Sequence, residues 1–153
     1  MASFVWKREP VEHLALEGWA GVRAWMTGRR GGVSPPPFST LNLSVYVRDL
    51  PYAVAENRRR ALLPGGPRRP LWARPEHGGR VHAVDGATAT IERGDGLVTR
   101  DASIVLAHTY ADCVPLFLFA PDIGWAGLLH AGWRGTVANI AAAGVAALVS
   151  EGA

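Results

Sequence analysis

Three side chains of types that bind transition metals stand out in the sequence: His77, Cys113 and His130. Each lies in a turn or at the end of an expected strand, where active-site residues tend to collect. One thiolate and two imidazoles suit a zinc ion with an open fourth position, an arrangement typical of catalytic rather than structural zinc. Cys113 is the single cysteine, so no second thiolate completes a structural site. We therefore predict one metal ion held by these three residues.

Other interpretations of the same residues stay open at this point. The three residues form no compact motif. Cys113 would therefore equally be a buried, inert cysteine, and the two histidines would form hydrogen bonds with the backbone. Two histidines and one cysteine are suitable ligands for copper as well. The five histidines contain no His-x-His pair, however, which the copper cluster of a multicopper oxidase would need. Cys113 with His130 as its base would suit a cysteine hydrolase that uses no metal.

Composition narrows the class of protein. The chain has 153 residues, 48% of them hydrophobic and 19% charged, which suits one folded domain with a real core. A net charge of +3 is too small to indicate binding to nucleic acid. Lys7 is the only lysine, and the many arginines suit either an anionic ligand or a coding bias of the source genome. We find no signal peptide and no apolar segment long enough to span a membrane, and therefore expect a cytoplasmic protein.

Apolar alternation and turn residues predict where the secondary structure lies. A helix is expected from Pro51 to residue 63 with Asp49 as its N-cap, and a second over residues 136–149 with Thr136 as its cap. Strands are expected at residues 22–27, 41–47, 71–74, 80–84, 103–108, 114–119 and 125–130. The last three should be neighbours in one sheet. This succession indicates a single α+β domain over residues 1–153, with mixed sheets flanked by helices in α/β/β/α-like layers.

Two motifs in the second half carry a family resemblance. The segment TYADCVPL around Cys113, followed by HAGWRGT from His130, closely resembles the signature of the laccase-domain family. Members of that family were first called polyphenol oxidases or multicopper oxidases, and later purine nucleoside phosphorylases. Further matches occur in the family's order at residues 30–34 (RGGVS), 41–43 (LNL) and 54–59 (VAENRR). The resemblance implies that His77, Cys113 and His130 bind zinc, with copper as the alternative.

The sequence departs from the family pattern in two places. The family usually has Gln-Val before the first ligand histidine, whereas this chain has Pro75 and Glu76, and a proline lacks a backbone N–H. The family also continues past the last helix with a further cysteine-containing motif that has no match here. We therefore expect a laccase-domain chain without the family's C-terminal portion, and an inactive fragment is one alternative.

The resemblance also implies an activity and a set of site residues. It implies phosphorolysis of adenosine, inosine or methylthioadenosine to the free base and ribose 1-phosphate, with some deamination of adenosine. The expected partners are therefore a nucleoside and phosphate, bound by a monomer or homodimer. Arg30 and Arg134 are candidates for anchoring phosphate, although Arg134 would equally suit a packing role beside the last helix. Asn42 would bind a ribose hydroxyl or base edge, or else close a turn. Asp112 would orient a ligand histidine, or else be structural.

Overall fold

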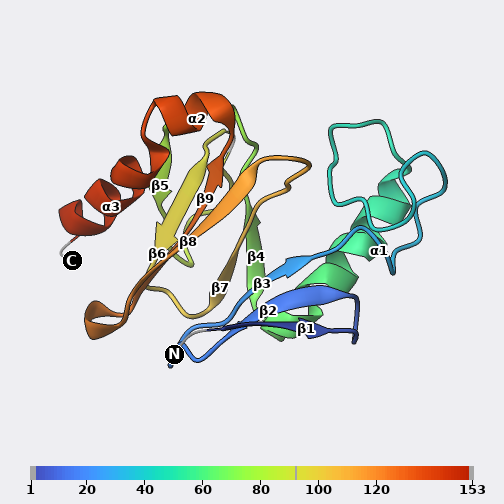
Figure 1. Cartoon of the computed structure of the whole chain (residues 1–153), viewed down its shortest axis with the longest axis horizontal. Helices are drawn as coiled ribbons and strands as arrows, with labels where there is room; N and C mark the ends of the chain where they lie inside the picture. The colour runs from blue at the N-terminus through green and yellow to red at the C-terminus, as the bar shows by residue number, and fades with distance from the viewer. Residues whose placement is uncertain (1–2, 92, 152–153) are drawn as a thin grey trace. The chain divides into compact units, whose positions relative to one another are not determined.

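A computed structural model describes residues 3–91 and 93–151 of the chain (Figure 1). The described residues form three β-sheets and three α-helices, which confirms the α+β class. The chain divides into two compact units, Met1–Pro67 and Arg68–Ala153, which we describe separately. A single domain over the whole chain stays a prediction. No helix in the described ranges has the length and apolar character needed to cross a membrane.

Unit 1 contains a three-stranded antiparallel sheet and one long helix. The strands β1 (Ser3–Lys7), β2 (His13–Glu17) and β3 (Ala24–Thr27) follow one another in the sheet. β3 matches the strand expected at residues 22–27, whereas β1 and β2 were not predicted. The indole Nε1 of Trp25 donates a hydrogen bond of 2.8 Å to the carbonyl oxygen of Ala61, which ties β3 to helix α1 (Pro51–Leu62).

Helix α1 lies where it was expected, but its start differs from the prediction. Its N-cap residue is Leu50, which provides no side-chain cap, and Pro51 lies in the first turn, where its missing N–H costs nothing. Asp49 is therefore not the cap. Its carboxylate instead accepts hydrogen bonds from Ser34 Oγ at 2.6 Å and Asn42 Nδ2 at 2.8 Å. The helix ends in the short 3-10 helix η1 (Leu63–Gly65).

The strand predicted at residues 41–47 is wrong, because this segment forms turns and irregular backbone. Asn42 Oδ1 accepts a hydrogen bond from the N–H of Ser44 at 3.0 Å, and the Ser44 hydroxyl accepts one from the N–H of Tyr46 at 3.2 Å. Such local side-chain bonds to the backbone compete with strand pairing. The alternation of apolar residues in this segment therefore occurs in successive turns and does not indicate a strand.

The loops of unit 1 converge on one fully buried side chain, Asn57 of α1. Its Oδ1 accepts a hydrogen bond of 2.8 Å from the N–H of Val33. Its Nδ2 donates to the hydroxyl of Ser34 at 2.8 Å and to the carbonyl oxygens of Thr40 at 3.1 Å and Asn42 at 2.9 Å. The motifs at residues 30–34, 41–43 and 54–59 thus meet around a single amide, which gives them a structural role.

Unit 2 contains a four-stranded sheet and a separate parallel pair. In the large sheet the order is β5 (Val81–Ala83), β6 (Gly96–Thr99), β9 (Trp125–Ala131) and β8 (Val114–Ala120). β8 and β9 are neighbours, as expected; they run antiparallel, and the short 3-10 helix η2 (Pro121–Ile123) joins them. The segment expected as their neighbour, β7 (Ile104–Ala107), pairs instead with β4 (Arg69–Trp72), so that part of the prediction is wrong.

Each face of the large sheet in unit 2 is covered by a different layer. On one face Val98 and Trp125 pack against Leu148 of helix α3 (Ile140–Ser150), which lies along this sheet in Figure 1. On the other face Leu97 packs with Leu71 of β4 and Ile104 of β7. Successive residues of β6 therefore serve two cores, because side chains alternate across a strand. β6 was missed in the sequence because a strand buried on both faces shows no alternation.

The helix predicted over residues 136–149 is two helices, α2 (Trp133–Val137) and α3. They are separated by Asn139, whose backbone is left-handed with φ of 57° and whose side chain accepts a hydrogen bond from the N–H of Ala142. Asn139 is thus the N-cap of α3. Thr136 is not a cap, since its hydroxyl donates to the carbonyl oxygen of Gly132 at 2.9 Å.

Candidate metal centre

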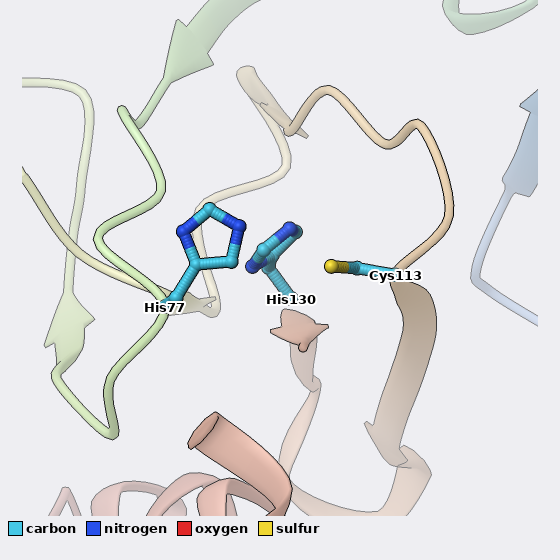
Figure 2. Close-up of side chains that lie close together, drawn as sticks. All are labelled: His77, Cys113 and His130. Carbon is cyan, nitrogen blue, oxygen red and sulfur yellow. The ribbon is translucent and has the colours of Figure 1, made fainter. Parts of the chain in front are cut away.

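The structure brings His77, Cys113 and His130 together at one end of the large sheet (Figure 2). One side-chain atom from each residue can serve as a ligand, and these three atoms lie within 4.8 Å of one another. Cys113 immediately precedes β8, and His130 lies near the end of β9, where the antiparallel register pairs residues 114 and 131. His130 is paired with Pro115, so strand pairing brings Cys113, two residues earlier, close to His130. His77 reaches them from the loop between β4 and β5.

His77 is exposed and has an unusual backbone conformation. Its φ is 61°, a left-handed value that non-glycine residues adopt only when the surroundings hold it. The carboxylate of Asp95 accepts hydrogen bonds from three successive N–H groups, those of Glu76 at 3.2 Å, His77 at 2.9 Å and Gly78 at 2.8 Å. Pro75 lies outside this set, so the departure from the family pattern removes none of the three donors.

His130 is buried, with 3% of its surface exposed, and it also contacts Asp95. Its Nδ1 lies 3.1 Å from Asp95 Oδ1. A carboxylate oxygen at this distance favours the tautomer with the proton on Nδ1, which leaves Nε2 available as a ligand atom. Burial lowers the pKa of His130 despite the opposing effect of Asp95, which favours the neutral imidazole that binds metal. The ring stands nearly perpendicular to that of His77, at 85° and a centroid distance of 5.0 Å.

Cys113 is half-buried, and its Sγ donates to Asp112 Oδ1 at 3.7 Å. Burial raises the pKa of the Cys113 thiol, and the neighbouring Asp112 carboxylate raises it further. A bound cation has the opposite effect and favours the thiolate. Gly132 allows the close approach of the ligands: a Cβ atom there would lie 3.1 Å from Cys113 Sγ and 3.1 Å from His77 Cδ2.

Two further rings, those of His108 and Tyr110, pack beside the ring of His130. The ring of His108 stacks on that of His130 with a centroid distance of 6.1 Å, and Tyr110 lies 5.4 Å from the same ring. Burial lowers the pKa of His108 to about 4, so its imidazole is neutral at physiological pH. Tyr110 donates its hydroxyl proton to the carbonyl oxygen of Leu129 at 3.1 Å, and burial raises its pKa. These contacts exclude water from one side of His130.

The remaining predicted site residues have different surroundings. Asp112 contacts Cys113, whereas the carboxylate at hydrogen-bonding distance from a ligand histidine belongs to Asp95. Arg134 is exposed, with its guanidinium 4.7 Å from the centre of the Trp133 ring. Arg30 and Asn42 belong to unit 1, and the Asn42 side chain takes part in the turn described above. Binding roles for Arg30, Asn42 and Arg134 therefore stay predictions.

Asp95 is the site residue that sequence reasoning missed. It precedes β6 in the segment Gly94-Asp95-Gly96, a place where an acidic residue usually marks a turn. Its side chain is fully buried, which is unusual for a carboxylate without several hydrogen-bond donors around it. An aspartate directly before an apolar strand was the only signal in the sequence.

Comparison with known proteins places the chain in a family. Residues 23–153 match the family model described as multi-copper polyphenol oxidoreductase laccase. The chain belongs to this family. The match spans both laccase-domain motifs and confirms the resemblance identified from the sequence. The copper in the family's description says nothing of the metal in this chain.

Curated relatives carry a different name. A protein of Mycobacterium tuberculosis named purine nucleoside phosphorylase is 40% identical over 137 residues, which are 86% of this chain and 54% of the relative. Another so named, from Streptomyces griseus, is 42% identical over 148 residues, which are 94% of this chain and 60% of the relative. The chain thus spans little more than half the length of these laccase-family relatives.

Solved structures agree with the described fold. The protein YfiH of Bacillus licheniformis superposes with a TM-score of 0.89 at 30% identity, covering 97% of this chain and 60% of its own. YlmD of Geobacillus stearothermophilus superposes with a TM-score of 0.80 at 36% identity, covering 91% of this chain and 56% of its own. The laccase-family fold is therefore present over almost the whole of the chain.

Proposed function

We propose that this chain is a cytoplasmic, zinc-dependent purine nucleoside phosphorylase. The observation that carries the proposal is the convergence of His77, Cys113 and His130 within 4.8 Å, in a chain whose relatives at about 40% identity are named purine nucleoside phosphorylases. The substrates would be phosphate and a purine nucleoside such as adenosine, inosine or methylthioadenosine. Some deamination of adenosine belongs to the same proposal.

The residues present fit a zinc ion. Two imidazoles and one thiolate are zinc ligands by type, and three protein ligands with one open position are typical of catalytic zinc. The orientation of His130 by Asp95 is the second contact that zinc-binding histidines usually have. Copper remains the alternative metal, since the same ligand types bind it. When bound, zinc supplies Lewis acidity and one coordination position for a small oxygen ligand.

The proposed reaction breaks one bond and forms one. A phosphate oxygen forms a bond to the anomeric carbon of the ribose while the bond from that carbon to the purine nitrogen breaks. The purine leaves with the electron pair and takes up a proton, which gives free base and ribose 1-phosphate. The guanidinium group of Arg134, which lies in the same unit as the ligand cluster, would bind the phosphate. The rings of His108 and Tyr110, which pack beside the ring of His130, would keep water from that metal-binding imidazole.

The test of the proposal is an assay of the zinc-loaded protein with adenosine, with and without phosphate. We expect adenine and ribose 1-phosphate in equal amounts, only when phosphate is present, and loss of both products in a His77→Ala variant. A His82→Ala variant is the matched control, because His82 bonds to the carbonyl oxygen of Arg93 and is not in the metal cluster. Inosine and ammonia without phosphate would indicate deamination. Lack of all products in zinc-loaded protein would refute the proposal in favour of an inactive fragment.

One observation favours a second candidate function. Asp95 contacts His130, and a ring nitrogen of His130 lies within 4.8 Å of Cys113 Sγ, which is the order of acid, base and nucleophile in a cysteine hydrolase. Chelation followed by zinc addition separates the two functions. A metal enzyme loses activity with the chelator and regains it with zinc, whereas a hydrolase stays active throughout. Oxidation of a phenol by copper-loaded protein would instead support a polyphenol oxidase.

A further inference from the structure

We propose that Asp95 is a positioning residue that couples two of the three metal ligands, so that the orientations of His77 and His130 depend on one carboxylate. This inference rests on the metal centre of the proposed function. It concerns how the chain prepares that centre, and it can be tested without any substrate.

The Asp95 carboxylate contacts four groups from two parts of the site. Its Oδ1 faces the N–H groups of Glu76 and His77 and Nδ1 of His130, and its Oδ2 faces the N–H of Gly78. Three of the four contacts share Oδ1 and one is on Oδ2, so both oxygens of the carboxylate are engaged. Asp95 is 0% exposed, so bulk solvent does not compete with these contacts.

The main chain of Asp95 is anchored independently of its side chain. Its N–H donates to the carbonyl oxygen of Arg80 at 2.9 Å, and its carbonyl oxygen accepts from the N–H of His130 at 2.6 Å. Asp95 therefore has a fixed place at the start of β6, beside β9 and the loop that contains His77. A carboxylate fixed in this way can hold the loop of His77 and the ring of His130 in a constant relation.

The two ligands need this carboxylate for different reasons. His77 has a left-handed backbone with φ of 61°, and the three N–H contacts stabilise the turn that includes it. His130 needs a proton on Nδ1 so that Nε2 can bind metal, and the contact to Asp95 selects that tautomer. Loss of the carboxylate would therefore loosen one ligand and leave the tautomer of the other unselected.

An Asp95→Asn variant separates these roles from simple space filling. Asparagine has nearly the same shape, but one of its two side-chain polar atoms is an NH2 group. In either orientation of the amide, this NH2 group faces at least one N–H of the loop or of His130, and two donors cannot bond to each other. Asp101→Asn is the matched control in the same unit. Asp101 also accepts loop N–H bonds, from Gly86 at 2.6 Å and Ser103 at 2.8 Å, and it is not in the ligand cluster.

The experiment is a titration of metal-free protein with cobalt(II), whose thiolate absorption band reports binding at Cys113. We expect Asp95→Asn to bind cobalt at least about tenfold more weakly than wild type, and Asp101→Asn to bind it equally well. Equal affinity of wild type and Asp95→Asn would overturn the inference. A wild-type protein that binds no cobalt would overturn the metal centre itself, whereas binding without phosphorolysis would refute only the proposed activity.

A second measurement uses the metal-free wild-type protein and does not depend on the variant folding. We expect slow hydrogen exchange for the amides of residues 76–78 and a protonated Nδ1 on His130 by nitrogen-15 NMR. Fast exchange of all three amides, or a proton on Nε2 instead, would contradict the role of Asp95. Where Asp95→Asn folds, exchange at residues 76–78 should be faster than in Asp101→Asn.

Discussion

Replacing Asn57 by alanine should destabilise the protein severely, because three loop segments depend on its amide. Val33 N–H and the Asn42 carbonyl oxygen lose the partner that the described structure provides. The Thr40 carbonyl oxygen keeps the N–H of Ser34, so its loss is smaller. The loss of these two bonds costs about 1–3 kcal/mol each, and removal of the fully buried Asn57 side chain adds a cavity, which gives about 4 kcal/mol for the variant. The melting temperature should fall by about 8–16 °C.

Chemical unfolding in urea, together with calorimetry, measures this change in the free energy of unfolding. Ser150→Ala is the control, because it also removes a side-chain bond to a backbone carbonyl, of 2.9 Å to Ala147, but at an exposed position. We expect that control to lie within about 0.5 kcal/mol of wild type. An Asn57→Ala variant as stable as the Ser150→Ala control would refute the structural role that we give to the motifs of unit 1.

Two further predictions concern the metal centre and the surface of α1. Gly132→Ala should keep the fold, because the φ of −78° at this position suits alanine. The added Cβ would displace Cys113 Sγ and the His77 ring. Zinc affinity, measured by competition with a chelator, should therefore fall about tenfold. Unchanged affinity would contradict the close packing at this glycine. Hydrogen bonds from Arg59 and, to a smaller extent, from Arg60 lower the pKa of Glu56 from 4.5 to about 2. Because the folded-state value is the lower one, the carboxylate contributes stability above pH 4.5 that disappears as the pH falls towards 2, and unfolding of Glu56→Gln should lack this dependence. Parallel pH profiles of the two proteins would argue against the ion pairs.

The parts of the fold that could be predicted are those whose signal is local. Apolar runs bounded by turn residues located β8 and β9, and Pro51 with the following residues located α1. The failures depend on long-range contacts or on single side chains. The pairing of β7 with β4 joins segments that are far apart in the sequence. The break between α2 and α3 depends on one residue with a left-handed backbone, Asn139.

The candidate site shows the same division. His77, Cys113 and His130 could be selected from ligand chemistry and family motifs, because those signals are side-chain types at particular positions. Asp95 could not, since its partners lie far along the chain and its own neighbours look like a turn. Asn42 was ambiguous for a related reason: an amide suits both a ligand and a turn, and the hydrogen bond from the N–H of Ser44 to its side chain shows the turn.

Metal content of the purified protein is the most direct test of the central claim. Elemental mass spectrometry should find about one zinc ion per wild-type chain and almost none in a Cys113→Ala variant. The variant should remain folded, because Cys113 is only half-buried and precedes β8 rather than forming its core. Zinc bound equally to both proteins, or to neither, would contradict a metal centre formed by His77, Cys113 and His130.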